Sequence, residues 1–203
     1  TEHFACVDPT LKKLAAGGKH QLLVQAGAGN GAAIPDGEFK AAGATIVAAA
    51  GEAYGADIVL KVRGPEAREL ALVKRGSILA GLLNPYDAAG IETLARTGVT
   101  GFAMEWLPRI TRAQSMDVLS SQANIAGYKA VIVAADEYRR FMPMLMTAAG
   151  TVKAARVLVL GAGVAGLQAI ATAKRLGAGI EAFDVRPAGK EQVEAVGAKF
   201  VWV

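Results

Sequence analysis

Short runs of branched aliphatic residues alternate along this chain with segments whose apolar positions recur at helical spacing. Such runs predict strands of a parallel sheet, because those strands are covered on both faces. Strands alternating with helices predict an α/β fold. In the first half of the chain the predicted strands are residues 21–25, 45–48, 58–62, 78–82 and 99–104. The predicted helices are residues 9–16, 37–43, 66–73 and 85–96, the first two following the candidate caps Asp8 and Asp36.

From Thr111 the pattern changes to one long helix that reaches about Phe141. Its apolar positions form a single stripe at helical spacing. That stripe comprises Met116, Leu119, Ala123, Ala126, Ala130 and Val133. Pro143 and the small residues around Gly150 then end the helix. We therefore expect residues 111–142 to connect two domains.

A glycine-rich turn, GAGVAG at residues 161–166, follows an apolar run, RVLVL at 156–160. The run predicts a buried strand, and residues 164–176 predict a helix. In such a turn Gly161 allows the tight bend, Gly163 allows a pyrophosphate to approach the backbone, and Gly166 allows the helix to pack closely on the strand. The free N–H groups and positive end of the helix dipole then face the pyrophosphate. This context predicts a dinucleotide site.

Asp184 ends the next predicted strand, at residues 179–184. Its carboxylate can accept hydrogen bonds from the adenosine ribose and would repel a 2′-phosphate, which favours NAD over NADP. Arg186, two residues later, weakens that preference. A degenerate nucleotide fold and a site for another adenosine ligand, such as S-adenosylmethionine, are the alternatives.

A predicted helix at residues 189–196 and a predicted strand at 199–203 follow Asp184. With the strands at 156–160 and 179–184 and the helix at 164–176, they make one β-α-β-α-β half of a dinucleotide fold. The half that carries the nicotinamide side is not in this sequence. We expect a first Rossmann-like domain at residues 1–110, the connecting helix at 111–142, and an NAD-binding Rossmann domain, truncated after its first half, at 143–203. The sequence begins at Thr1, so we interpret the chain as a piece of a longer protein.

Composition narrows the chemistry further. The net charge is +4 and the pI is 9.3, but the basic residues are scattered, which argues against nucleic acid as a partner. With one cysteine (Cys6) and two histidines (His3 and His20), no disulfide framework, metal centre or Ser-His-Asp arrangement is expected. The longest uncharged run, residues 157–173, contains the three glycines and is better explained by a strand, turn and helix than by a bilayer span. A reducing, cytoplasmic compartment is expected.

Several blocks of sequence resemble one family. They are GLLNPY at 81–86, GFAMEWLP at 101–108, RITRAQSMDVLSSQANIAGY at 109–128, MTAAGT at 146–151, GAGVAGLQAI at 161–170 and FDVRP at 183–187. These blocks are similar to the NAD-binding alpha subunit (domain I) of proton-translocating NAD(P) transhydrogenase, in the alanine dehydrogenase/transhydrogenase family. The resemblance implies two Rossmann-like domains that bind NAD(H) and form a homodimer. It also implies a membrane-spanning component and a separate NADP(H)-binding partner, with this subunit peripheral to the inner membrane on the cytoplasmic or mitochondrial matrix side.

The resemblance assigns roles to individual residues. Arg109, Gln114 and Asp117 would reach the nicotinamide end of the cofactor, and Ser120 would add a further contact. The pyrophosphate turn comprises Gly161, Gly163, Val164, Ala165 and Gly166, and the adenosine-ribose side comprises Asp184, Val185 and Arg186. Two ordinary structural explanations remain open. Gln114 fits a Thr-x-x-Gln capping box, and Arg109 could form an ion pair with Asp117.

These residue types suit hydride transfer between two nicotinamide rings. That reaction moves no proton to or from a substrate hydroxyl, so the protein needs only to position the cofactors and set the electrostatics. An alanine dehydrogenase-like amino-acid dehydrogenase is one alternative, because Lys61 matches that relative's substrate-binding lysine. Its histidine would fall at residues 82–84, where this chain has Leu-Leu-Asn, so Lys61 is expected to be structural. A fragment without independent activity is the other alternative.

Overall fold

The computed structural model describes residues 9–202, so the predicted cap Asp8 and the residues Cys6 and His3 lie outside the described residues. The chain divides into two compact units, Thr1–Met116 and Asp117–Val203. Apart from one hairpin, every paired strand among the described residues is parallel. The predicted α/β class with parallel sheets is therefore confirmed.

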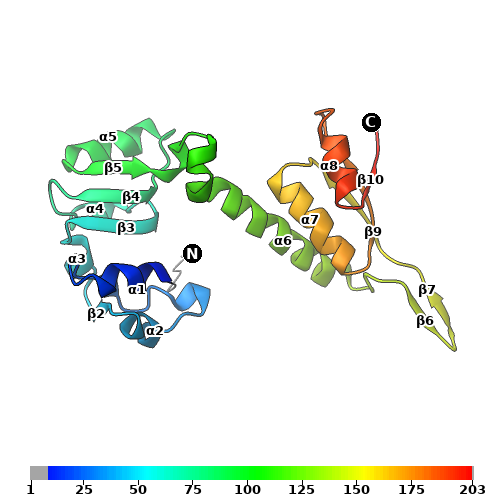
Figure 1. The fold of residues 1–203 in the computed structure, drawn as a ribbon, viewed down its shortest axis with the longest axis horizontal. Helices are drawn as coiled ribbons and strands as arrows, with labels where there is room; N and C mark the ends of the chain where they lie inside the picture. Colours follow the sequence, from blue (N-terminus) through cyan, green and yellow to red (C-terminus); the bar gives the residue numbers. More distant parts are fainter. Residues whose placement is uncertain (1–8, 203) are drawn as a thin grey trace. The chain divides into compact units, whose positions relative to one another are not determined.

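The first unit contains two parallel sheets. The smaller pairs β1 (Leu23–Gln25) with β2 (Thr45–Val47). The larger has the order β3-β4-β5, and Figure 1 shows these three strands side by side. Their bounds are Ile58–Arg63, Ile78–Leu82 and Thr100–Ala103. All five strands lie at predicted positions, within two residues at each end.

The described part of this unit has five α-helices, one before β1 and one in each connection between successive strands. They are α1 (Pro9–Ala16), α2 (Asp36–Ala41), α3 (Ala50–Tyr54), α4 (Ala67–Leu70) and α5 (Ala88–Arg96). The short helix α3 was not predicted. Asp36 was expected to cap α2, but it is the first helical residue, and its Oδ1 accepts a hydrogen bond from the Gly27 N–H at 2.9 Å.

Only one face of the β3-β4-β5 sheet is well covered. Val59 and Leu79 are buried there, with Tyr54 of α3 packed against them. Successive side chains of a strand point to opposite faces. On the second face Ile58, Leu60 and Phe102 are 55%, 73% and 55% exposed. The prediction of coverage on both faces is therefore wrong for residues 9–202, because the helices of this unit bury the Val59 face alone.

Three 3₁₀ turns complete the first unit, η1 (Asn30–Ala32), η2 (Met104–Trp106) and η3 (Thr111–Met116). The last of these corrects the predicted start of the long helix. That helix, α6, covers Val118–Tyr138 and belongs to the second unit. It begins where Asp117 caps it, so Thr111 and Gln114 do not start the α-helix.

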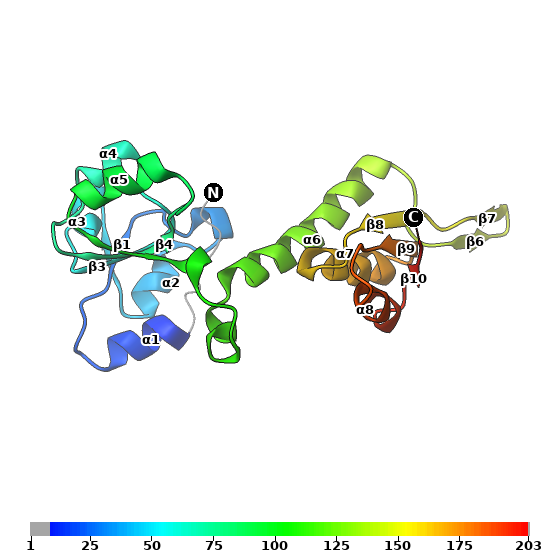
Figure 2. The same cartoon turned by 90° about the horizontal axis from the view of Figure 1, so that it is seen from above.

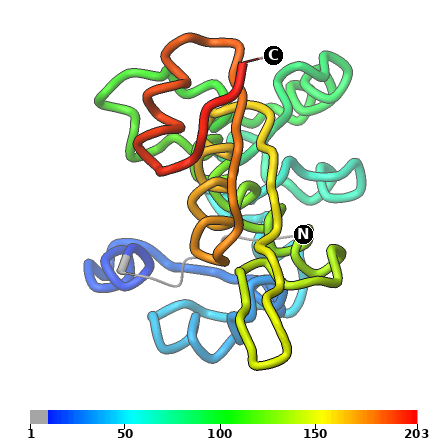
Figure 3. The backbone as a smooth tube through the Cα atoms, turned by 90° about the vertical axis from the view of Figure 1, so that its right-hand side faces the viewer, coloured from blue at the N-terminus to red at the C-terminus, as the bar shows by residue number. Residues whose placement is uncertain are grey.

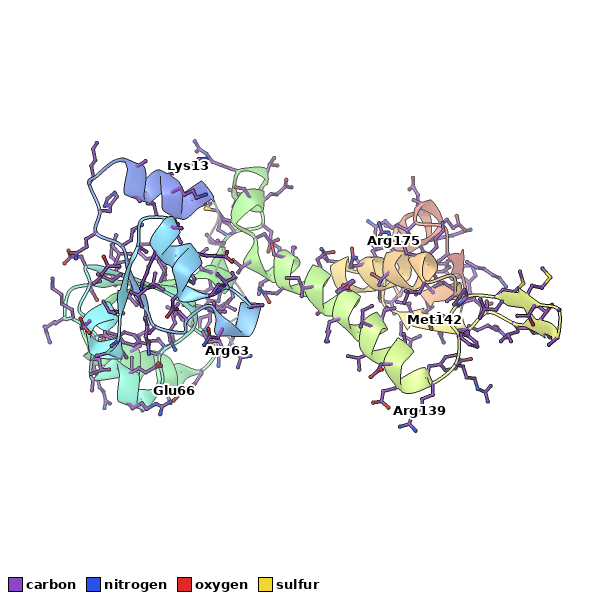
Figure 4. The ribbon with its side chains drawn as sticks, turned by 90° about the horizontal axis from the view of Figure 1, so that it is seen from below. Lys13, Arg63, Glu66, Arg139, Met142 and Arg175 are labelled. Carbon is purple, nitrogen blue, oxygen red and sulfur yellow. The ribbon has the colours of Figure 1, made fainter. Side chains whose placement is uncertain are left out.

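The long helix packs on α7 (Val164–Arg175), and Figure 2 shows the two side by side. Its buried residues are Gly127 and Val131. A Cβ on Gly127 would overlap the carbonyl oxygen of Ala165, so the helices approach at a glycine. The apolar stripe predicted for α6 is not the packed face, since Leu119 and Val133 are 39% and 48% exposed. Arg139, labelled in Figure 4, has φ 53° and ends the helix.

The second unit contains a parallel sheet of order β10-β9-β8. Its strands are Arg156–Leu160 (β8), Gly179–Phe183 (β9) and Lys199–Phe200 (β10). The connections are α7 and α8 (Gly189–Ala195). Figure 3 traces the chain from β8 into α7 and back into β9. The core of this unit lies between the helices and the sheet, and its fully buried residues include Ile170 of α7, Ala182 of β9 and Val193 of α8. This is the predicted β-α-β-α-β arrangement.

An antiparallel hairpin of β6 (Leu145–Thr147) and β7 (Gly150–Val152) precedes β8. The sequence predicted only a helix break here. The small Ala-Ala-Gly segment turns the chain, and Met146 at the hairpin is 73% exposed. Figures 1 and 2 both show the hairpin extending away from the sheet of its own unit. Among residues 9–202, no helix combines the length and apolar character that crossing a bilayer requires.

Candidate functional site

The turn from β8 into α7 is built on its glycines. Gly161 has φ +99°, a conformation that favours glycine, and its N–H donates to the Phe183 carbonyl at 2.8 Å. A Cβ on Gly166 would overlap the carbonyl oxygen of Gly161. Gly161 therefore permits the bend and Gly166 permits helix and strand to touch, as their spacing predicted.

Gly163 differs from both. Its φ of −77° suits any residue, and a Cβ placed on it would find no atom within 4 Å. Packing within this unit therefore does not require glycine at position 163. Gly163 is the N-cap of α7, and the N–H groups of the first helical turn have no acceptor within their own helix. Open space beside these N–H groups, at the positive end of the helix dipole, fits an anionic group such as a pyrophosphate.

Asp184 ties the end of β9 to this turn. Its side chain is 6% exposed, and its Oδ2 accepts a hydrogen bond from the Ala162 N–H at 2.6 Å. On its other side it lies against α8, where a Cβ on Gly189 would come within 2.7 Å of the Asp184 Cβ. The sequence placed Asp184 near the turn, but it did not predict this direct bond or the role of Gly189.

Arg186 occupies the remaining acceptor positions of Asp184. Its backbone N–H and Nε donate to Oδ1 at 2.8 and 3.0 Å, and its Nη2 donates to Oδ2 at 3.1 Å. The same Nη2 also donates to the Ala162 carbonyl at 3.3 Å. These Arg186 bonds, with that from Ala162, hold the pKa of Asp184 far below its usual range, and the carboxylate in turn raises the pKa of Arg186. The sequence identified both residues as candidates but did not predict that they bind each other.

Asp184 and Arg186 differ in the solvent exposure of their side chains. The Arg186 side chain is 59% exposed, whereas that of Asp184 is almost fully buried. Val185, between them, is 84% exposed, and Val164 at the start of α7 is 44% exposed. Ala165 lies against Gly127 of α6. The predicted pyrophosphate and ribose residues are therefore brought together at the carboxyl ends of β8 and β9, where α/β sheets bind ligands.

The residues predicted for the nicotinamide end lie on both sides of the division between the units. Arg109 and Gln114 are exposed residues of the first unit, Gln114 within η3. Asp117 and Ser120 belong to the second unit and contact each other. The Ser120 N–H donates to Asp117 Oδ1 at 2.9 Å, and its hydroxyl donates to Oδ2 at 2.7 Å. Asp117 and Ser120 thus form the N-terminal cap of α6.

Lys61 on β3 also has a specific partner. Its Nζ lies 2.9 Å from Glu69 Oε2 of α4, and the same oxygen accepts the Glu66 N–H at 2.7 Å. Burial raises the pKa of Glu69, but these hydrogen bonds outweigh it and the net pKa is lowered. The pair agrees with a structural role for Lys61. Within the described residues, no group of three or more His, Cys, Asp and Glu side chains could hold a metal ion.

Comparison with known proteins identifies the family. Residues 2–126 match the family described as alanine dehydrogenase/PNT, N-terminal domain, and residues 130–203 match its C-terminal domain. This chain belongs to the alanine dehydrogenase/PNT family. The predicted family resemblance is confirmed.

Three members show how close the similarity is. An NAD(P) transhydrogenase alpha subunit of Rhodospirillum rubrum is 51% identical over 209 residues, covering 100% of this chain and 54% of that protein. The crystal structure of transhydrogenase from Sinorhizobium meliloti matches with a TM-score of 0.90 and 56% identity, over 95% of this chain and 58% of that chain. Alanine dehydrogenase of Mycobacterium tuberculosis is 35% identical over 87% of this chain and 48% of that protein. The chain thus spans about half the length of each of these two curated relatives.

Proposed function

We propose that this chain is the NAD(H)-binding portion of an NAD(P) transhydrogenase alpha subunit. The observation that carries the proposal is the glycine turn at Gly161–Gly166, bonded through Ala162 to a buried Asp184 at the end of the neighbouring strand. The higher identity to transhydrogenase than to alanine dehydrogenase favours the first of the two named activities.

In this proposal the pyrophosphate lies against the open backbone at Gly163 and receives N–H groups from Val164, Ala165 and Gly166. Asp184 and Arg186, with Val185 exposed between them, form the adenosine-ribose side. Arg109, Gln114 and Asp117 contact the nicotinamide end, and Ser120 holds the Asp117 carboxylate in position. The last assignments rest on the sequence block at residues 109–128 that resembles the family.

The dinucleotide supplies the hydride donor or acceptor, and a partner component holds NADP(H). The residues of this chain bind the dinucleotide, orient it and shield it from water. None of them is needed to take up or release a proton during direct hydride exchange. We further propose a homodimer that associates with membrane-spanning and NADP(H)-binding components. Its place would be peripheral to the inner membrane, on the cytoplasmic side or, in a eukaryote, on the matrix side.

An alanine dehydrogenase is the less favoured alternative. Lys61, at the position of that relative's substrate-binding lysine, is paired with Glu69 at 2.9 Å, which supports a structural role. The sequence also lacks a histidine at residues 82–84. Formation of NADH from alanine by this chain would reverse that conclusion.

The direct test is titration of the purified chain with NADH and with NADPH, followed by cofactor fluorescence and calorimetry. Preferential binding of NADH that is lost in Asp184→Ala supports the proposal, with Lys190→Ala as a matched charge-removal control in the same unit. Such binding would justify adding the NADP(H)-binding partner and measuring hydride exchange. No binding of NADH, or turnover of a 2-oxo acid by the chain alone, would contradict the proposal.

A further inference from the structure

The Asp184 carboxylate has no acceptor position to spare. A carboxylate offers about four lone-pair sites, and four donors occupy them. One is the Ala162 N–H, and three belong to Arg186: its backbone N–H, Nε and Nη2. A ribose diol can therefore bond to Asp184 only by replacing the side-chain donors of Arg186. The guanidinium and the ribose compete for the same carboxylate.

The surroundings of the two residues indicate that the Arg186 side chain moves and that Asp184 stays in place. Asp184 is fixed from two sides, by the bond to Ala162 and by the close approach of Gly189 in α8. The Arg186 side chain is 59% exposed, so it can turn outwards while its backbone stays in place. Once displaced, it remains tethered two residues from Asp184, next to the ribose position. A guanidinium there is suited to a 2′-phosphate, which it binds bidentately.

We propose that Arg186 is a specificity-determining residue of the dinucleotide site, held back from a 2′-phosphate by its bonds to Asp184. The preference for NAD(H) then belongs to the pair and not to Asp184 alone. Removing the Asp184 charge while keeping its shape releases Arg186, and the site comes to favour the 2′-phosphorylated ligand. This inference rests on the proposed dinucleotide site and goes beyond it by assigning the discrimination to two residues that act against each other.

The substitution that separates the two roles is Asp184→Asn. The asparagine oxygen can still accept the Ala162 N–H, so the turn keeps its link to β9. The amide nitrogen that replaces Oδ1 cannot accept from the Arg186 backbone N–H or from Nε. The neutral oxygen that replaces Oδ2 binds Nη2 less strongly than a carboxylate does, so the guanidinium is released. The suitable probes are ADP-ribose and 2′-phospho-ADP-ribose, because they lack the nicotinamide and report on the adenosine half alone.

Four proteins are titrated with both probes by calorimetry: the unaltered chain, Asp184→Asn, Arg186→Ala and the double variant. The unaltered chain should prefer ADP-ribose. Asp184→Asn should bind 2′-phospho-ADP-ribose about 10- to 100-fold more tightly than the unaltered chain does, as expected for new charge-assisted hydrogen bonds. The double variant should lose that gain. Arg186→Ala should bind ADP-ribose at least as tightly as the unaltered chain, because the competing donor is gone.

The control variant is Lys190→Ala, which removes a nearby positive charge that pairs with Glu194. It should leave the ratio of the affinities for ADP-ribose and 2′-phospho-ADP-ribose unchanged. If Asp184→Asn keeps the original preference, or if the double variant binds the 2′-phosphate as tightly as Asp184→Asn, the role of Arg186 is refuted while the dinucleotide site stands. If the unaltered chain binds neither probe, the dinucleotide site and the inference both fail. Should Asp184→Asn not fold, a weaker affinity of Arg186→Ala for ADP-ribose would still refute the competition.

Discussion

The glycines at 163 and 166 allow a prediction that separates folding from ligand binding. An alanine at 166 places its Cβ on the carbonyl oxygen of Gly161, 2.9 Å from the carbonyl carbon and 3.5 Å from a methyl of Val159. Two of these three atoms belong to the backbone of a turn whose φ is +99°, so they cannot move without opening it. Overpacking of this kind typically costs about 1–3 kcal/mol, and a backbone obstacle favours the upper end.

Replacing a helical glycine by alanine also contributes about 1 kcal/mol of helix propensity in the opposite direction. The net loss of unfolding free energy for Gly166→Ala is therefore about 2 kcal/mol, the difference between the two effects. For a unit of this size, 1 kcal/mol corresponds to a shift in Tm of about 4–8 °C, so the midpoint should fall by roughly 8–16 °C. Scanning calorimetry, supported by circular dichroism at 222 nm, measures it.

Gly163→Ala is the matched control, since its Cβ meets no atom within 4 Å and its φ is ordinary. Its Tm should stay within about 2 °C of the unaltered chain, as expected for a substitution that creates no clash. Its affinity for NADH should nevertheless fall, because the new methyl occupies the space assigned to the pyrophosphate. Equal melting temperatures for the two variants would refute the packing argument. Unchanged NADH affinity in Gly163→Ala would refute the placement of the pyrophosphate.

Three further predictions concern other contacts. Folding lowers the pKa of Asp184, so its contribution to stability is present above its unfolded pKa and is lost as the pH falls through its folded pKa. Between about pH 5 and pH 2, the Tm of Asp184→Asn should therefore fall less than the Tm of the unaltered chain. An equal fall in both proteins would exclude Asp184 as the source of the acid sensitivity. Asp117→Ala should lower the stability of α6 by about 1 kcal/mol, while Asp117→Asn, also a good N-cap, should keep it in urea unfolding; equal losses would show that the charge of Asp117, and not its cap, is the stabilising feature. Gly127→Ala should destabilise the second unit by about 1–2 kcal/mol, because its Cβ meets the Ala165 carbonyl, and a rise in Tm would show that α6 and α7 can separate without cost.

The sequence predicted the strands and the glycine turn because those signals are local. RVLVL at residues 156–160 specifies a strand by composition, and Gly161 and Gly166 fall where a bend and a close contact require them. The same run could not predict what covers each face. Leu158 and Leu160 are as apolar as Val157 and Val159, yet Leu158 and Leu160 are 58% and 73% exposed.

The long helix illustrates a second limit. Thr111 and Gln114 fit a capping box, but Asp117 competes with them and bonds both the N–H and the hydroxyl of Ser120, so the α-helix begins at Val118. Its packed face contains Gly127 and Val131, and not Leu119 or Val133 of the predicted stripe. The hydrophobic pattern gives most weight to strongly apolar side chains, so it does not detect an interface at which two helices approach through a glycine.

The pairing of Asp184 with Arg186 was likewise not predictable from spacing. Two residues of opposite charge at positions i and i+2 can point apart or together, and here the chain bends after β9 so that the Arg186 backbone and side chain face the same carboxylate. Knowing both residue types identified the ribose side, but the competition between them depends on that bend.

The peptide groups next to Ala162 give this arrangement an intrinsic spectroscopic reporter. The Ala162 N–H donates to Asp184, and the Ala162 carbonyl accepts from Arg186, so one residue senses both partners. An amide proton bonded to a carboxylate at 2.6 Å should resonate well downfield and exchange slowly with solvent. In an ¹⁵N-labelled sample, the shift of that one cross-peak would follow the ionisation of Asp184 and the release of Arg186 without any dye or added label.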